Sequence, residues 1–122
     1  MYHVVLMTFG EFIRLQRETL KSDDKRFSVR QVAKRVSLEP AYLSKIERDE
    51  VAPPSEGKIV AIAKELKEDP DLLLAMAGKV SSDLLDVIKE RPQLFGDLIR
   101  ELKAQPEHAI LRLVREVRDG DW

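Results

Sequence analysis

The sequence predicts an all-α fold, and two observations lead to this prediction. Apolar residues recur three or four positions apart along nearly the whole chain, which is the spacing of one helix face, and only the short Val4-Val5-Leu6 run departs from it. Serine, threonine, aspartate or proline stands where most of these repeats begin, as at helix N-termini. The 122 residues include no cysteine, so the core has to form without disulfides or thiolate zinc sites.

The first two predicted helices are short and are separated by a polar break. Thr8 is suited to cap a first helix over about 9–20, which the segment 22–25 then ends. Ser28 is suited to cap a second helix that ends near residue 36. Gln31 stands three residues after this serine, which completes the pattern of a capping box.

Three further helices follow before residue 78. Glu39 and Pro40 open a third helix that runs to about residue 48, because proline is tolerated at the first helical position, where no backbone donor is needed. Ser55 is suited to cap a fourth helix that ends near residue 66. Asp69 and Pro70 are suited to start a fifth helix, predicted over 71–77, and Gly78 ends it.

The remaining chain forms a C-terminal appendage of three amphipathic helices, over about 82–90, 92–103 and 106–118. Their apolar faces are wide for one small domain to cover. Two interpretations remain open: the helices pack back on the first and fifth helices of the same chain, or they form a dimer interface. We favour the interface and expect it to include Leu98, Leu102, Ile110, Leu113, Val114 and Val117.

Charge is distributed unevenly along the chain. The formal net charge is −1, yet the segment 25–48 contains seven lysines and arginines against two glutamates. A local basic patch matters more for nucleic-acid binding than the total charge does. Such charges also solvate the faces of many ordinary helices, so the motif within this segment has to decide between the two interpretations.

The second and third helices carry the most informative segment, SVRQVAKRVSLEPAYLSKIERDE. Two short helices joined by a tight turn allow the second one to lie in the major groove of DNA. Together with FGEFIRLQR, PPSEGKIVAIAKEL and DPDLLLAMAGKV, the segment closely resembles the phage-repressor, or xenobiotic-response-element, family of helix-turn-helix transcriptional regulators. This resemblance covers about Thr8 to Val80. It implies a five-helix DNA-binding domain with a recognition helix over 39–48, and usually a symmetric dimer on a palindromic operator.

The expected organisation is an N-terminal arm over 1–7, a DNA-binding domain over 8–80 and a helical region over 81–122. Ser37 and Asp49 depart from the family pattern, because members often carry glycine there. The connection 21–27 is longer than the common form, and it either touches DNA or is passive. The residues before Met7 are either an extended arm or an artefact of the assigned start.

One side of the third helix is predicted to read bases. Four of its residues lie opposite the apolar Leu43 and Ile46: Pro40, Ala41, Ser44 and Lys45. Lys45 can donate to guanine, Ser44 can donate or accept, and Pro40 and Ala41 can pack on a thymine methyl group. Contacts with the DNA backbone are expected from Arg30, Gln31, Tyr42 and Arg48.

Several neighbouring residues have competing interpretations. Glu39 either accepts from a cytosine amino group or caps the third helix, and capping is favoured. Tyr42 either contacts DNA or packs against the second helix. Lys34 and Arg35 are expected to be solvated. Arg17 and Glu47 resemble a structural pair that bridges the first helix to the end of the third in this family.

Enzymatic activity is not expected, because His3 and His108 are far apart and no paired catalytic motif or phosphate loop is present. Neither a cofactor nor a metal is predicted. No apolar run approaches the roughly 18 residues of a membrane span, so we expect a cytoplasmic protein. The expected partners are double-stranded DNA and a second copy of the chain. The alternative is an antitoxin or adaptor whose main role is to bind an unidentified protein partner.

Overall fold

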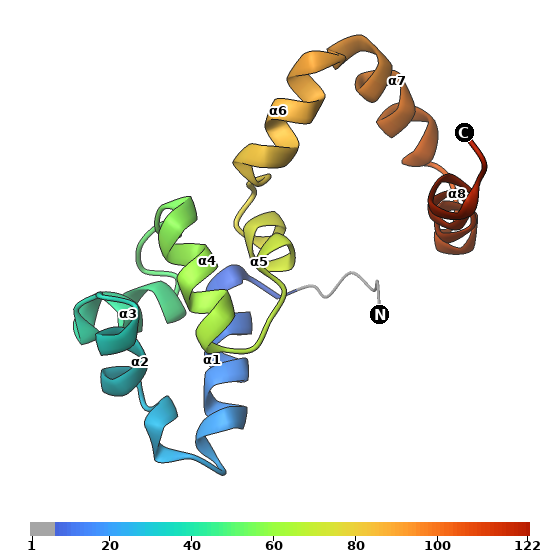
Figure 1. The fold of residues 1–122 in the computed structure, drawn as a ribbon. Coiled ribbons are helices and arrows are strands. Elements are labelled where there is room, and N and C mark those ends of the chain that lie inside the picture. The colour runs from blue at the N-terminus through green and yellow to red at the C-terminus, as the bar shows by residue number, and fades with distance from the viewer. Residues whose placement is uncertain (1–6) are drawn as a thin grey trace. The chain divides into compact units, whose positions relative to one another are not determined.

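The computed structural model describes residues 7–122 and confirms the all-α prediction for this range, in which no strand occurs. The Val4-Val5-Leu6 run and all but the last residue of the expected arm 1–7 lie outside the described residues. The elements (Figure 1) are α1 Phe9–Lys21, the 3-10 helix η1 Lys25–Phe27, α2 Val29–Arg35, α3 Pro40–Glu47, α4 Glu56–Glu65, α5 Pro70–Met76, α6 Ser82–Glu90, α7 Pro92–Leu102 and α8 Glu107–Asp119. The predicted helix ends agree with these bounds to within about one residue, the usual uncertainty of helix ends.

The described residues form two compact units, one that ends at Ser81 and one over Ser82–Trp122. The first unit contains α1–α5, coloured blue to yellow in Figure 1, and the second contains α6–α8, coloured orange to red. Within the first unit, α3 packs against both α1 and α2, while α4 packs against α2 and α5. Helix α3 therefore has neighbours on its inner side from two other helices.

A hydrophobic core fills the first unit. Ala33 of α2 is fully buried, and the absence of a larger side chain there lets α2 and α3 approach closely. All five helices and η1 contribute to this core, which consists of Phe9, Ile13, Phe27, Val32, Ala33, Val36, Leu43, Ile46, Ile59, Ile62, Ala63, Leu66, Leu73 and Leu74. The apolar spacing of α3 thus predicted its buried side, Leu43 and Ile46, correctly.

Three of the predicted N-terminal caps are formed by side chains, and one of them is Asp69, whose carboxylate accepts from the Asp71 amide at 2.9 Å. The Thr8 hydroxyl accepts from the Glu11 amide, and the Glu11 carboxylate accepts from the Thr8 amide, both at 3.0 Å, which is a complete capping box. The Ser28 hydroxyl accepts from the Gln31 amide at 3.2 Å. The Gln31 side chain does not return this bond, so only half of the capping box predicted there exists.

Two other caps differ from the prediction. Glu39 and Ser55 are the N-cap residues of α3 and α4, but neither side chain makes a capping hydrogen bond. The expectation that the Glu39 carboxylate caps its helix is therefore wrong. A glutamate has one methylene more than the aspartate that usually serves as a cap, and the Glu39 side chain is exposed to solvent instead.

Helices α2 to α5 all end in the same backbone motif. The residue after each C-cap has a positive φ, near +60° at Ser37, Asp49 and Lys67 and +76° at Gly78. At each end the following amide donates to a carbonyl five residues earlier, as Leu38 donates to Ala33 at 2.9 Å. This is the Schellman motif, whose left-handed residue is usually glycine. Ser37 and Asp49 therefore adopt the left-handed conformation that glycine usually has at this position, although each of them carries a side chain.

The second unit has a different character. No residue of α6, α7 or α8 is buried, and the apolar side chains Leu94, Ile99, Val114 and Val117 are each more than half exposed. Helix α6 contacts α7. This unit therefore consists of amphipathic helices without a buried core.

Within residues 7–122, no helix is long and apolar enough to cross a membrane.

The left-handed turn between α2 and α3 supplies a stability prediction. Ser37→Gly should raise the free energy of unfolding by about 0.5–1 kcal/mol, because glycine adopts this φ without the steric penalty of a side chain. Urea unfolding followed by circular dichroism measures the change. Ser55→Gly is the matched control, since Ser55 is exposed, makes no capping bond and has a φ of −62°. It should lower the free energy of unfolding by a few tenths of a kcal/mol, and equal effects at both positions would contradict the argument.

Candidate nucleic-acid interface

Helix α3 has a buried side and an exposed side. Leu43 and Ile46 face the core and are each 1% exposed. Pro40, Ala41 and Lys45, three of the four residues predicted to read bases, are exposed on the other side. The fourth, Ser44, is half-buried and lies next to α1 and α2, because it lines a hollow together with Arg17 and Val29. Three of the four are thus exposed, whereas Ser44 is partly covered.

The C-terminal end of α3 is fixed to α1 by a buried ion pair. Arg17 Nε donates to Glu47 Oε2 at 2.7 Å, and Arg17 Nη2 donates to Glu47 Oε1 at 2.9 Å. Arg17 is 4% exposed and Glu47 is 5% exposed. Arg17 Nη1 also donates to the Phe27 carbonyl at 3.2 Å. This planar, two-bond geometry holds the angle between α1 and α3 as well as their distance.

Two further contacts at the same end of α3 come from the start of α1. A Cβ atom on Gly10 would collide with the backbone carbonyl of Ile46, so the two helices touch where only glycine fits. The Thr8 hydroxyl donates to Asp49 Oδ2 at 2.7 Å while it caps α1. The first turn of α1 is therefore in direct contact with the turn that ends α3.

The turn between α2 and α3 is held from the other side by α4. Lys58 Nζ donates to the Val36 carbonyl at 2.9 Å and to the Ser37 carbonyl at 3.2 Å. Sequence analysis missed this contact, because nothing in the local pattern connects a lysine with a turn about twenty residues earlier. It satisfies carbonyls that the end of α2 would otherwise expose.

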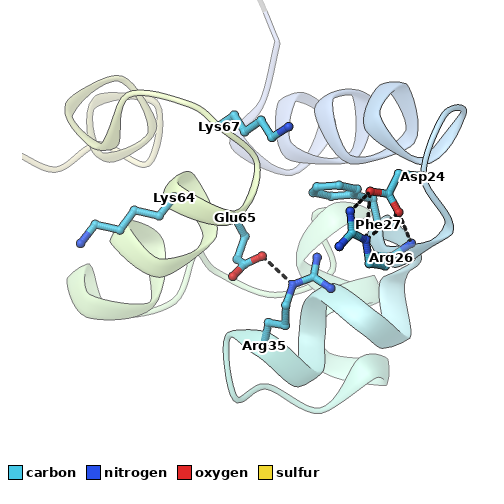
Figure 2. Close-up of a pocket in the computed structure, with 7 residues that line it drawn as sticks. All are labelled: Asp24, Arg26, Phe27, Arg35, Lys64, Glu65 and Lys67. Atoms are coloured by element: carbon cyan, nitrogen blue, oxygen red, sulfur yellow. Dashed lines mark hydrogen bonds and ion pairs between the residues drawn. The ribbon is translucent and has the colours of Figure 1, made fainter.

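Arg35 provides a second contact between α2 and α4. Its Nε donates to Glu65 Oε2 at 2.6 Å, and its guanidinium lies 5.3 Å from the centre of the Phe27 ring. Figure 2 shows this bond beside the ring, with Lys67 approaching the ring from α4's end. The expectation that Arg35 is merely solvated is therefore wrong, because an acid on α4 and an aromatic ring from η1 are both within its reach.

The last residue of the long connection 21–27 attaches this segment to the core. The segment forms η1, and Phe27 inserts into the core. The Asp24 carboxylate accepts from the Arg26 side chain and backbone amide, and these bonds lower the pKa of Asp24 to about 2. These residues line the hollow of about 340 Å³ that Figure 2 shows. Asp24 and Arg26 thus form a local ion pair at the rim of this hollow.

Ion pairs reduce the basic patch that the sequence predicted over 25–48. Among the described residues, Arg26 pairs with Asp24, Arg35 with Glu65, and Arg48 with Glu50. The cations of this segment that make no ion pair within residues 7–122 are Lys25, Arg30, Lys34 and Lys45. Positive charge near α3 is therefore concentrated on fewer side chains than the sequence count implies.

The four residues expected to contact the DNA backbone lie at the ends of α2 and α3. Arg30 and Gln31 are exposed on the first turn of α2, and Arg48 is exposed at the C-cap of α3. Tyr42 is 37% exposed and is not among the residues packed on the core. All four are accessible on the first unit.

Residues predicted for the dimer interface lie on α7 and α8. Leu98, Val114 and Val117 are exposed, whereas Leu102, Ile110 and Leu113 are half-buried.

Among the described residues, no group of three histidine, aspartate or glutamate side chains could hold a metal ion.

The buried pair makes a second stability prediction. Glu47→Gln should lower the free energy of unfolding by about 3–5 kcal/mol, because it leaves the buried Arg17 charge beside only the exposed carboxylate of Glu18, 3.8 Å from Arg17 Nη2. Urea unfolding measures the change. Glu50→Gln is the matched control, since Glu50 forms its ion pair at the surface, where such pairs contribute about 0–1 kcal/mol. Similar small losses in both variants would show that the pair does not constrain α3.

A comparison with protein-family models gives one result that fits this geometry. A model described as a helix-turn-helix domain matches residues 8–76, more than half of the chain and the whole of α1–α5. No curated protein and no solved structure matches the sequence. A helix-turn-helix places its second helix in the major groove, which indicates DNA binding and a role in transcriptional regulation. The chain belongs to the helix-turn-helix domain family.

Proposed function

We propose that this chain is a sequence-specific transcription regulator of the phage-repressor type, which binds a palindromic operator as a dimer through the helix at 39–48. The observation that carries the proposal is that α3 is held in a fixed position by its neighbours. Contacts from α1 fix its C-terminal end through Arg17 and Gly10, and its apolar side is buried, so its outer side is presented rigidly. A recognition helix needs this rigidity, because base contacts depend on a fixed angle in the groove.

The outer side of α3 has the chemistry for base recognition. Lys45 is exposed and makes no ion pair within the described chain, so its ammonium group is free to donate to guanine O6 or N7. Pro40 and Ala41 offer small apolar surfaces for a thymine methyl group. Contacts with phosphates from Arg30, Gln31, Tyr42 and Arg48 would fix the register of the domain without reading sequence.

Dimerisation through the C-terminal helices completes this proposal. A palindromic operator has two half-sites about 34 Å apart, and it matches a protein with two-fold symmetry. The absence of buried residues in α6–α8 supports the proposed division of the chain into a DNA-binding domain over 8–80 and a dimerising region over 81–122. Such a dimer blocks polymerase without further contacts, which favours repression over activation.

The exposed apolar side chains of α6–α8 also favour one alternative, an antitoxin or adaptor whose main role is to bind a protein partner. In that case the outer side of α3 would be a scaffold surface. DNA affinity would then not depend on Lys45, which separates the two functions experimentally.

Binding selection on random duplex DNA at fixed, near-physiological salt tests the proposed function. We expect the wild type to enrich a palindrome. Lys45→Ala should relax the preference at one position in each half-site, at a cost of about 1–3 kcal/mol. Arg48→Ala should weaken binding to all sequences alike. A wild type that enriches no sequence would refute the proposal in favour of the protein-binding alternative.

Sedimentation equilibrium tests the proposed dimer interface. Val117→Glu should weaken dimerisation about tenfold to a hundredfold, because two-fold symmetry would bring a buried charge from each copy into one apolar interface. Val117 is 58% exposed in the single chain, so the variant should fold. Leu15→Glu is the matched control, since Leu15 is 50% exposed on α1, outside the proposed interface. Equal association of both variants and the wild type would place the interface elsewhere.

A further inference from the structure

A small hollow lies where α1, α2 and α3 meet, beside the exposed side of α3. Its volume is about 130 Å³, room for about four water molecules at roughly 30 Å³ each, and a phosphate group is of similar size. It is lined by Arg14, Arg17, Glu18, Val29, Ser44, Glu47 and Arg48, and we call it the α1–α3 notch. Three arginines and two glutamates line it, and a third glutamate, Glu50, pairs with Arg48 at its edge.

The inner wall of the notch is formed by a guanidinium that is largely engaged within the protein. All three nitrogens of the Arg17 guanidinium already donate within the protein: Nε and Nη2 to Glu47, and Nη1 to the Phe27 carbonyl. This pair is buried and neutral as a unit. A ligand in the notch would therefore be held mainly by the rim, which consists of Arg14, Ser44 and Arg48.

The rim residues are oriented but have unused donors. Arg14 Nε donates to Glu18 Oε1 at 3.2 Å, and Arg48 Nε donates to Glu50. Each of these bonds holds a guanidinium through one nitrogen and leaves its two Nη nitrogens without a hydrogen-bond partner in the described part of the chain. The Ser44 hydroxyl, half-buried between them, likewise has no partner there.

Two guanidinium groups and a hydroxyl around a space of this size match the chemistry of a phosphate group, whose several oxygens accept bonds from different directions. We propose that the α1–α3 notch binds one backbone phosphate of the DNA whose bases α3 reads. This proposal rests on the proposed function: Ser44, which lines the notch, directly precedes Lys45, the proposed base reader, on α3. It assigns Arg14 of α1 to the DNA interface and makes Ser44 a phosphate ligand instead of a base reader.

The salt dependence of operator binding tests this proposal. Dissociation constants for the selected operator and for a mismatched duplex are measured between about 50 and 200 mM salt. Arg14→Gln should weaken binding to both duplexes about threefold to tenfold and reduce the slope of log affinity against log salt by about 0.9, the value for one phosphate contact. Arg14→Lys keeps the charge and should restore most of the slope. Ser44→Ala should weaken both duplexes alike, without changing base preference.

Arg112→Gln is the matched control. Arg112 makes the same kind of contact as Arg14, because its Nε donates to the glutamate four residues later, Glu116 Oε1, at 3.1 Å. It lies on α8, in the other unit. The substitution should leave the slope unchanged. Thermal unfolding of each variant shows whether the fold is retained, and Arg14, which is exposed at the surface of α1, should tolerate the change.

The outcomes separate this proposal from the proposed function. If the wild type selects an operator but Arg14→Gln keeps the wild-type slope, the notch does not bind a DNA phosphate and the proposed function stands. A changed base preference in Ser44→Ala would return Ser44 to base reading and overturn its assignment. If inorganic phosphate binds to the wild type but not to Arg14→Gln, while the two have the same slope for DNA binding, the notch is a free-anion site instead. A wild type that does not bind DNA overturns both proposals.

Discussion

Two opposite charges lie buried where α1 meets the end of α3, and the position of the exposed side of α3 depends on them. Separating Arg17 from Glu47 would leave a desolvated charge on each side, so the two helices cannot drift apart without a large loss of free energy. The same guanidinium donates to the Phe27 carbonyl, which places the end of the long connection 21–27. One side chain thereby relates three elements of the first unit.

The other contacts around α3 act at its ends. Gly10 and Thr8 meet the turn that follows α3, and Lys58 meets the turn that precedes it. Both turns contain a residue in the left-handed conformation, which gives the chain a sharp reversal within a few residues. A helix of only eight residues has little stability by itself, so its direction is set by the packing of its neighbours.

The electrostatics of the first unit follow from these contacts as well. Several arginines of the basic segment are engaged by acids, and the net charge of the chain is −1, so general attraction to DNA is weak. Recognition would then rest on a few placed donors near α3, with Lys45 on the outer side and Arg14 and Arg48 around the notch. A dimer doubles these contacts, which is a physical reason for the proposed assembly.

The sequence by itself determined the helices, most of their N-terminal residues and the buried side of α3, because capping and amphipathic spacing depend on residues within one or two turns. It also indicated the pairing of Arg17 with Glu47, though only through resemblance to a known family. It failed for Glu39, whose exposed side chain makes no capping bond, and for Arg35, whose partner Glu65 lies 30 residues further along the chain. Only the tertiary structure decided the contact of Lys58 with the turn, the half-buried place of Ser44 and the notch that Arg14 shares with Arg48. These features join residues about 20 to 35 positions apart, and their distances are set by the angles at which helices pack, which no local spacing encodes.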